Sequence, residues 1–574
     1  MTSRSTLVAR RLSKAIKNDV FTADGQIASA GVSANQYDSL AALPLSGIAA
    51  GTKAFINDSD RLYISNGTGW YSIALTNASP SITSVLDSDG GITPFTLATD
   101  GSATVITVAA TDSDGTPLTY NYSVSSGSLN GSTVTQDSSV FTVTPHASNA
   151  TTFDLTFTAT DGINTATSGA NSFTLSFGVD WSSITQQAQI QASNADGYDN
   201  FGTSVAISKD ENTVIVGAAK DDTGDTNSGS AYIFTKSGSS WSQQAQIQGS
   251  DTSGFDEFGT SVSISEDGNT VIVGAIGESA SGSFAGSAYI FTRSGSTWSQ
   301  QAKIQSSDIQ AGDRFGNAVS ISDDGNTAII GALNSAPGGS TVAGSAYIFT
   351  RSGSTWSQQA KLLASDKEDF DQFGWSVSIS GSDGNTAIVG APTEDTNGSN
   401  AGSAYIFTRS GSTWSQQAKI QASNAGSGDY FGESVSISDD GNTAIIGSPY
   451  EDSGGSNAGS VYIFTRSGST WSQQARMQAS DNSANAYFGN STNISEDGDT
   501  VIVGARNANN GAGYAYIFTR SGSSWTQENK IQASNAGAGD QFGFSVAISA
   551  ETVIVGAYVE DTTAADSGSA YIFS

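Results

Sequence analysis

Residues 414–470 read WSQQAKIQASNAGSGDYFGESVSISDDGNTAIIGSPYEDSGGSNAGSVYIFTRSGST. Related units follow one another from Trp181 to the end of the chain, and their opening tryptophans are 54 to 60 residues apart. A repeat of this length indicates a supersecondary unit that buries its apolar surface against its neighbours. Both the Phe-Gly pair and the Tyr-Ile-Phe triplet occur seven times. The pairs begin at Phe201, Phe258, Phe315, Phe373, Phe431, Phe488 and Phe542.

Each unit contains four apolar runs of strand length. In the first unit, Phe201, Val205 and Ile207 share one face by alternation, whereas residues 213–216 are apolar at nearly every position. The second pattern is typical of a strand covered on both faces. The run from Trp241 to Ile247 alternates with polar residues, as expected of a half-exposed outer strand. Asp-Gly-Asn and Ser-Gly-Ser turns separate the runs, so the unit predicts a four-stranded antiparallel sheet.

Seven such sheets bury both faces when they are stacked radially. The repeat starts with an outer strand in residues 181–193 and ends with the inner strand of Tyr571, Ile572 and Phe573. The last sheet therefore lacks an outer strand, and the first segment is a spare one. We predict that residues 180–574 form an all-β, seven-bladed β-propeller with four-stranded blades, and that the N-terminal outer strand closes its ring.

The seven Phe-Gly pairs, the Gly-Ala pairs and the Tyr-Ile-Phe triplets resemble the FG-GAP repeat family, a propeller module also found in integrin α-subunits. Repeats of the integrin type often carry a calcium loop of the form D-x-D-x-D-G. Here the first two ligand positions are serine, as in Ser263, Ser265 and Asp267, and again in Ser320, Ser322 and Asp324. Neutral hydroxyls are poor calcium ligands. We therefore expect plain Asp-Gly turns and no cofactor, with structural calcium as the lesser alternative.

The composition excludes several classes of function. The 574 residues include 23 Lys and Arg against 54 Asp and Glu, a net charge of −31, which disfavours nucleic acid as a partner. There is no cysteine, and His146 is the only histidine. A Ser-His-Asp relay within the propeller and a multi-histidine zinc site are therefore excluded. No apolar run approaches the ~18 residues of a spanning helix, so no membrane insertion is expected.

Residues 1–20 are basic, with Arg4, Arg10, Arg11, Lys14 and Lys17 against a single acid. In the same segment, Val8, Leu12 and Ile16 recur at the spacing of a short amphipathic helix, and charges interrupt every apolar stretch, so there is no signal-peptide core. Three interpretations stay open: a frayed tail, a helix that docks on a larger assembly, and a transit peptide.

Two small modules precede the propeller. Residues 21–79 predict a three-stranded meander, with strands at residues 54–56, 62–64 and 70–73. Residues 80–179 contain six strand-like runs, which suits a β-sandwich of immunoglobulin or cadherin type. The Asp-Gly pairs at Gly115 and Gly162 are expected to be simple turns. The stretch DRLYISNGTGWYSIAL and the sandwich after it resemble structural proteins of tailed phages, marine ones in particular, over residues 36–178. That resemblance implies a virion component.

The antiparallel blades place alternate loops on opposite ends of the disc. The Asp-Gly-Asn and Ser-Gly-Ser turns share a uniform face. The loop before each Phe-Gly pair and the loop after each Gly-Ala pair share a face that varies between units, and such variation marks a binding face. The candidate binding residues on this variable face are Tyr198, Asp221, Asp222, Phe255, Phe284, Phe370, Glu394, Asp395, Tyr450, Glu451, Asp452, Tyr514, Tyr558, Glu560 and Asp561, beside Tyr430 and Tyr487.

Two repeated charges have structural interpretations. An aspartate lies two or three residues ahead of several Phe-Gly pairs, and we expect Asp256, Asp313, Asp371 and Asp540 to cap turns. A cation follows each of six triplets, and we expect solvated side chains for Lys236, Arg293, Arg351, Arg409, Arg466 and Arg520.

The modular order favours a phage virion appendage, a fibre-like surface protein and not an enzyme. Residues 1–79 would dock to other virion proteins, the sandwich would act as a spacer, and the propeller would bind a glycan or protein of the host surface. Homo-oligomers are compatible with this arrangement. The alternative is a bacterial surface adhesin, for which the sequence shows no export signal or anchor. A glycan-processing enzyme is the third hypothesis, since paired carboxylates serve glycoside hydrolysis.

Overall fold

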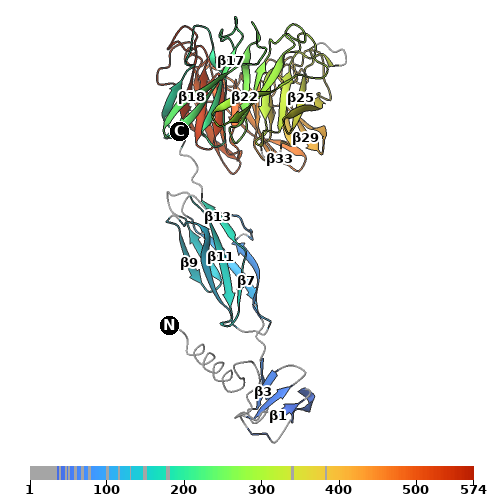
Figure 1. Ribbon diagram of the computed structural model, residues 1–574, viewed down its shortest axis with the longest axis vertical. Coiled ribbons are helices and arrows are strands. Elements are labelled where there is room, and N and C mark those ends of the chain that lie inside the picture. The colour runs from blue at the N-terminus through green and yellow to red at the C-terminus, as the bar shows by residue number, and fades with distance from the viewer. Residues whose placement is uncertain are drawn as a thin grey trace. The chain divides into compact units, whose positions relative to one another are not determined.

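The computed structural model describes residues 35–37, 40–44, 48–49, 52–56, 61–65, 70–74, 79–88, 90–97, 102–113, 117–129, 131–145, 151–175, 181–337, 342–381 and 384–574. The predicted basic helix of residues 1–20 and His146 lie outside these ranges. The described residues contain no α-helix, and none of their helical segments is long and apolar enough to cross a membrane. The chain divides into two compact units, Met1–Gly178 and Val179–Ser574 (Figure 1).

The N-terminal unit contains a small sheet with four strands, one more than predicted. Its order is β1 (Asn35–Tyr37), β2 (Lys53–Ile56), β3 (Arg61–Ser65) and β4 (Trp70–Ala74), and the short helix η1 covers Leu40–Ala42. The added strand β1 runs parallel to β2, and a three-residue strand carries no periodicity that a sequence would reveal. Leu43, Ala54 and Tyr63 form its small core, against which Trp70 packs.

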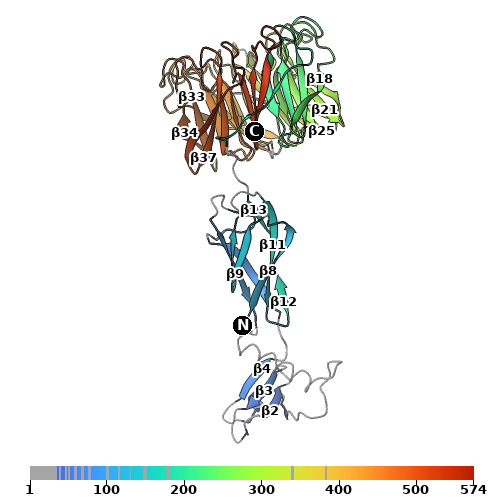
Figure 2. The same cartoon turned by 90° about the vertical axis from the view of Figure 1, so that its left-hand side faces the viewer.

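The same unit contains two further sheets around one apolar core. One sheet has the order β5 (Ser81–Asp87), β7 (Thr104–Thr111), β10 (Val140–Thr144) and β9 (Thr133–Asp137). The other has the order β12 (Thr165–Thr167), β11 (Thr151–Thr160), β13 (Asn171–Leu175) and β6 (Phe95–Thr96), with β8 (Thr119–Gly127) also paired to β11. Phe141 from the first sheet and Phe157 from the second lie 4.8 Å apart in the shared core. The strands β5, β6 and β12 were not predicted. Figure 2 shows both sheets.

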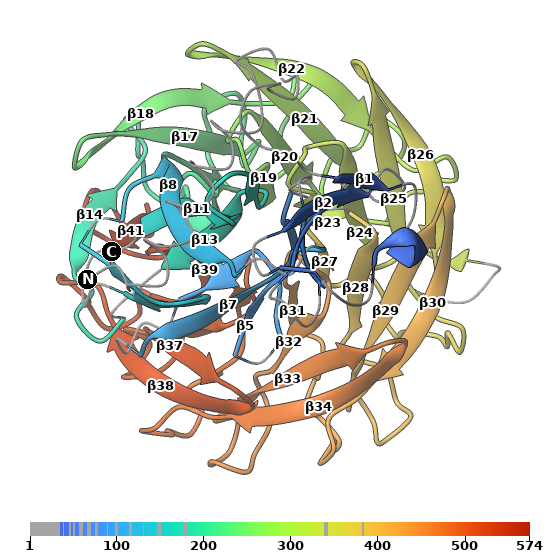
Figure 3. The same ribbon diagram turned by 90° about the horizontal axis from the view of Figure 1, so that it is seen from below.

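Val179–Ser574 is a β-propeller of seven four-stranded blades, as predicted. The first strands of all seven blades line one central cavity of about 230 Å³. They are β15 (Phe201–Ile207), β19 (Phe258–Ile264), β23 (Phe315–Ile321), β27 (Val377–Ile379), β31 (Ser434–Ile437), β35 (Thr492–Ile494) and β39 (Ser545–Ser549). Figure 3 shows the blades arranged in a ring.

The second strands are buried along their whole length, and the third strands are buried over most of theirs. The second strands are β16 (Thr213–Ala218), β20 (Thr270–Ala275), β24 (Thr327–Ala332), β28 (Thr386–Ala391), β32 (Thr443–Ser448), β36 (Thr500–Ala505) and β40 (Thr552–Ala557). The third strands are β17 (Ser230–Ser237), β21 (Ser287–Ser294), β25 (Ser345–Ser352), β29 (Ser403–Ser410), β33 (Ser460–Ser467), β37 (Tyr514–Ser521) and β41 (Ser569–Phe573).

The outer strands are half-exposed, as their alternation predicted. They are β18 (Ser240–Ile247), β22 (Thr297–Ile304), β26 (Thr355–Leu362), β30 (Thr413–Ile420), β34 (Thr470–Met477), β38 (Ser524–Ile531) and β14 (Gln186–Ile190). Strand β14 pairs antiparallel with β41, the last strand of the chain. Strand β15 of the first blade lies against β39 and β40 of the last.

Two glycines set the distance between neighbouring blades. A Cβ atom on Gly217, the glycine of the first Gly-Ala pair, would lie 1.9 Å from the carbonyl oxygen of Gly259 in the next blade. The same approach recurs at all seven blade junctions, at 1.9–2.2 Å, and includes Gly556 of the last blade against Gly202 of the first. Gly259 also has a φ of +98°, which disfavours any other residue. The backbones therefore touch where the sequence repeats its two glycines.

Polar side chains complete the junctions at the centre and at the rim. The first strands are sheet edges, and their free N–H groups donate hydrogen bonds to serine hydroxyls of the preceding blade. For example, the N–H of Ile321 donates to the Ser263 hydroxyl at 3.2 Å. At the rim, the indole N–H of Trp298 donates to Gln244 of the preceding blade at 2.8 Å. The repeated Ser-x-Ser and Trp-Ser-Gln-Gln motifs are thus contacts between blades.

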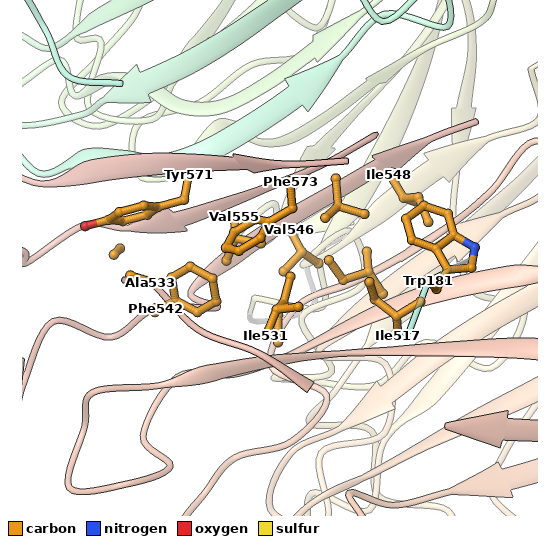
Figure 4. Close-up of a cluster of buried hydrophobic side chains, with 14 residues drawn as sticks. Trp181, Ile517, Ile531, Ala533, Phe542, Val546, Ile548, Val555, Tyr571 and Phe573 are labelled. Carbon is orange, nitrogen blue, oxygen red and sulfur yellow. The ribbon is translucent and has the colours of Figure 1, made fainter. Parts of the chain in front are cut away.

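Trp181 departs from this pattern. It lies five residues ahead of the Gln186–Gln187 pair. In the other units the tryptophan lies two residues ahead of the equivalent pair, and Ile184 occupies that position here. Trp181 is nevertheless buried among Ile517, Ile548 and other side chains of the last two blades (Figure 4). The Asn529 amide donates to its carbonyl oxygen at 2.7 Å.

The repeated cations were predicted to be solvated, but the structure shows that the arginines among them contact other side chains. The guanidinium of Arg293 stacks on Trp298, 5.4 Å from the ring centroid, and donates to Asn269 at 2.8 Å and to Thr213 of the preceding blade at 3.1 Å. The same stacking recurs at Arg351, Arg409, Arg466 and Arg520. Sequence alone could not place these side chains, because their partners belong to neighbouring turns and blades.

The glycine contact makes a testable prediction. Substituting Gly274→Ala forces a methyl group against the Gly316 carbonyl oxygen, and we expect a loss of about 3 kcal/mol in unfolding free energy, since backbone atoms cannot yield. Tryptophan fluorescence in urea measures it. The control is Gly295→Ala, where φ is +62° but nothing lies within 4 Å, and about 1 kcal/mol is expected. Equal losses in the two variants would contradict the role of the contact.

Candidate binding face

Four large aromatic side chains are exposed on the variable face. Tyr198, Phe255, Phe284 and Phe370 are exposed to 64%, 55%, 46% and 60%. All four have a left-handed backbone, with φ between 55° and 71°. We call these four residues the junction aromatics. Left-handed conformations suit glycine and asparagine and are costly for bulky side chains.

The sister repeats show what the fold itself requires at these positions. The left-handed position of Tyr198, Phe255 and Phe370 is occupied in the other blades by Gly312, Gly428, Asn485 and Gly539. The position of Phe284 is occupied elsewhere by Asn227, Val342, Asn400, Asn457, Gly511 and Asp566. The loops therefore form without aromatic residues.

The junction aromatics occupy four successive blade junctions. The N–H of Tyr198 donates to Ala565 of the last blade, and that of Phe255 donates to Thr226 of the first, both at 2.8 Å. Arg314 of the third blade donates to the carbonyl of Phe284 at 3.1 Å. Phe370 lies three residues ahead of Phe373, whose N–H donates to Ala343 of the third blade at 2.9 Å. Each aromatic residue thus lies at, or three residues from, a hydrogen bond that joins the loops of two blades.

The predicted acidic residues have a different place. The first member of each pair, Asp221, Glu394, Glu451 or Glu560, is buried, with at most 5% exposed. Glu394 accepts hydrogen bonds from Ser403 at 2.7 Å and from Lys419 at 2.9 Å. Burial opposes its ionisation, but these bonds lower the pKa of Glu394 below its ordinary value. These carboxylates are internal, contrary to the solvent-facing position expected of them.

The second members cap their own loops. Asp222 accepts from the N–H of Asn227 at 2.6 Å, and the equivalent bonds are made by Asp395, Asp452 and Asp561. The aspartates before the Phe-Gly pairs cap turns as predicted. Asp256 accepts from Ser253 at 2.7 Å, and Asp313, Asp371 and Asp540 accept equivalent bonds. Burial raises the pKa of Asp371 to about 6.

Two blades lack the buried acid. In the sixth blade, Ala508 replaces it, and Tyr514 packs against the core with the Lys530 ammonium 3.3 Å from its ring centroid. Tyr514 is thus a packing residue. In the third blade, Ser335 replaces the acid, and a cavity of about 260 Å³ remains beside Lys361 and Pro337.

A second set of aromatic residues gathers on the inner side of blades five to seven. The rings of Tyr430 and Tyr450 are 4.9 Å apart, and those of Tyr450 and Tyr487 are 5.1 Å apart. Phe544 and Tyr558 continue the set with rings 4.1 Å apart. Arg506 joins its two halves. We call these six residues the inner arc, and all are partly buried.

Sequence reasoning identified the tyrosines of the inner arc but missed Arg506 and Phe544. The available signal was the comparison of repeats. Phe544 stands two residues after its Phe-Gly pair begins, where Thr203, Thr260 and Asn317 stand in the first three blades.

Charged residues also crowd the central cavity at its uniform-face end. Lys209 lies 3.0 Å from Asp439, 3.6 Å from Glu266 and 3.7 Å from Asp323. Burial and the neighbouring Asp439 carboxylate raise the pKa of Asp323 to about 7. Among the described residues, no group of three or more His, Cys, Asp or Glu side chains is arranged to hold a metal ion. In the Asp-Gly turns, Ser265 donates to Asp267 at 2.6 Å, so these groups bond to each other.

Comparison with known proteins identifies the repeat. A family model described as FG-GAP repeat matches residues 184–234, 241–291, 298–349, 356–407, 414–464, 471–518 and 525–573. No curated protein matches the chain.

Solved structures show distant likeness. A periplasmic gluconolactonase of Pseudomonas aeruginosa is 14% identical, with a TM-score of 0.42 over 74% of this chain and 97% of that one. A GH74 xyloglucanase of Xanthomonas campestris is 11% identical, with a TM-score of 0.38 over 67% of this chain and 55% of that one. The β-propeller domain of a Pyrococcus furiosus protease is 11% identical, with a TM-score of 0.35 over 62% and 90%.

The crowding of Asp323 and Asp439 predicts a pH-dependent effect. A carboxyl whose folded pKa of about 7 exceeds its ordinary 3.8 costs stability as pH rises through that interval. We expect Asp323→Asn to raise the unfolding free energy by about 1–2 kcal/mol at pH 8 and to have no effect near pH 4. Urea unfolding at both pH values measures it.

The neighbouring Asp324→Asn is the control. Burial opposes its ionisation, but hydrogen bonds from Ser322 and Asn326 lower the pKa of Asp324, so this variant should lose stability at pH 8. A loss of stability in Asp323→Asn at pH 8 would contradict the repulsion.

Proposed function

Since this chain belongs to the FG-GAP repeat family, we propose that its propeller is a binding module of a tailed-phage virion appendage and contacts the host surface with its variable face. The observation that carries the proposal is the set of junction aromatics. They are exposed, they hold unfavourable backbone conformations, and other repeats fold with glycine, asparagine, valine or aspartate in their place. A side chain that costs the fold about 1 kcal/mol and packs on little of it is retained for contact with a partner.

The virion assignment is supported by the N-terminal modules. The phage-like stretch covers residues 36–178, and the chain has no Lys or Arg between residues 62 and 208, so its N-terminal positive charge is concentrated before that region. We propose that residues 1–79 dock on the particle and that the sandwich, an immunoglobulin-like spacer, carries the propeller outward. Mass spectrometry of purified particles that detected no peptides of this chain would refute this assignment.

Binding is favoured over catalysis because of where the carboxylates lie. Glycoside hydrolysis needs two acids facing a substrate. The first acids of the variable-face pairs are buried and hydrogen-bonded within their own blades, and the second acids cap loops. This supports a recognition surface without hydrolytic chemistry. A bacterial surface adhesin would use the same face. Mass spectrometry of purified particles distinguishes that hypothesis from the virion hypothesis.

We also infer that β14 closes the ring. Besides pairing with β41, this segment reaches the sixth blade, where the N–H of Ser534 donates to Gln186 at 2.9 Å. The equivalent bond between other blades joins Ser250 to Gln300. The segment therefore supplies the contacts that a continuous outer strand makes elsewhere.

Deleting residues 181–193 is expected to abolish cooperative unfolding of the propeller and to lower its melting temperature, because β41 becomes an exposed edge. Differential scanning calorimetry measures both. A permuted chain that carries residues 181–193 after Ser574 is the control, and we expect it to melt near the original temperature. An unchanged melting temperature in the deletion would sink the closure scheme.

The junction aromatics are tested by the residue that sister repeats use. The triple variant Tyr198→Gly, Phe255→Gly and Phe370→Gly should keep its unfolding free energy within about 1 kcal/mol, since relief of strain offsets the flexibility of glycine. We expect its adsorption to host cells, measured with fluorescently labelled protein, to fall at least tenfold. The control is Val342→Asn, a left-handed position on the same face, with unchanged adsorption. Full adsorption by the triple variant would refute the proposal.

A further inference from the structure

The inner arc contains an arginine that lies between two aromatic rings. The guanidinium of Arg506 lies 5.6 Å from the ring centroid of Tyr487 and 5.4 Å from that of Phe544. Within the described part of the chain, no hydrogen bond or ion pair involves this guanidinium. By contrast, the stacked Arg293 donates to both Asn269 and Thr213. Two rings therefore flank the guanidinium of Arg506, and its N–H groups have no hydrogen-bond partner among the described residues.

The fold does not require this arrangement. Arg506 directly follows a Gly-Ala pair, and the same position in the other blades is occupied by Ala219, Ile276, Leu333, Pro392, Pro449 and Tyr558. The backbone beneath it is fixed independently, because the N–H of Arg506 donates to the Asn490 side chain at 3.1 Å. Asn490 in turn donates to the carbonyl of Phe544 at 3.0 Å. The scaffold thus positions both residues without using the guanidinium.

Aromatic faces continue on both sides of the arginine. Tyr430, Tyr450 and Tyr487 form one wall, and Phe544 with Tyr558 forms the other. Among the described residues, the hydroxyl groups of these four tyrosines donate no hydrogen bond. Partly exposed aromatic rings pack against the C–H faces of sugars, and tyrosine hydroxyls form hydrogen bonds with sugar hydroxyls.

The charge of the arc favours an anionic ligand group. A guanidinium presents paired N–H donors that match a planar carboxylate. Glu433 is an acidic residue that interacts electrostatically with Arg506, but the two make no ion pair within 4 Å. Burial raises the pKa of Glu433 to about 7, although Arg506 opposes this, so near neutral pH it carries only part of its charge.

We propose that the inner arc binds an acidic sugar residue, with the sugar carboxylate on the guanidinium of Arg506 and the sugar ring against the tyrosine walls. The proposed sugar site rests on the proposed function in one respect, because it lies on the same variable face. It adds the chemical class of the ligand that this face binds. A single guanidinium does not supply the cationic surface that nucleic acid needs, and a neutral sugar leaves the arginine unused.

The test uses the full-length chain and a trisaccharide of uronic acid, with its methyl ester as the uncharged counterpart. We expect saturation-transfer NMR and calorimetry to detect the acid and to show binding of the ester at least tenfold weaker. Arg506→Gln should weaken binding of the acid at least tenfold, and Tyr450→Ala should weaken both the acid and the ester. Arg314→Gln, an exposed arginine on the same face, is the matched control and should change binding less than twofold.

Several outcomes would overturn the inference: equal binding of acid and ester, no binding of either, or unchanged binding in Arg506→Gln. Equally tight binding of an acidic peptide would show that the ligand class is wrong. Urea unfolding of each variant separates a folding defect from a binding defect. Adsorption to host cells without uronate binding would sink this inference alone, whereas uronate binding without adsorption would sink the proposed function alone.

Discussion

The propeller depends on the contact between two backbones at each blade junction. At each of the seven junctions, the carbonyl oxygen of the Phe-Gly glycine lies 1.9–2.2 Å from where a Cβ atom on the second-strand glycine of the preceding blade would be. This contact sets a spacing at which the first strands enclose only a small cavity. The hydroxyl groups that cap the inner strands and the glutamines that receive the indole N–H groups reach their partners only at this spacing. The absence of a side chain at two glycines thus permits the blade spacing on which the polar contacts depend.

Most repeated polar residues serve the fold. Buried acids bind serine and lysine, arginines stack on tryptophans, and aspartates cap loops. A chain with few charges and no cysteine stabilises its blades by satisfying buried polar groups, since each unsatisfied group costs about 1–3 kcal/mol. Function must therefore be sought where some repeats depart from the others, because the remaining repeats show what folding alone demands.

Those departures divide the variable face into two regions. The junction aromatics belong to the boundaries from the last blade through the fourth, and the inner arc belongs to blades five to seven. The first region offers exposed apolar rings, which suit a broad contact. The second offers rings around an unpaired guanidinium, which suit a smaller anionic group. A repeat protein gains this asymmetry by substitution at loop positions, while the glycine contacts stay unchanged.

The sequence by itself determined the seven four-stranded blades, the order of strands within each blade, the two classes of loop and the turn-capping aspartates such as Asp256. Each of these is a local pattern of periodicity or turn chemistry that recurs from unit to unit. Short strands such as β1 escaped prediction, because three residues show no period. The inward direction of Glu394, the stacking of Arg293 and the approach of Arg506 to Phe544, 38 residues later, were decided only by the tertiary structure. A loop side chain is buried or exposed according to the neighbouring blade, and the sequence of one repeat does not contain that neighbour.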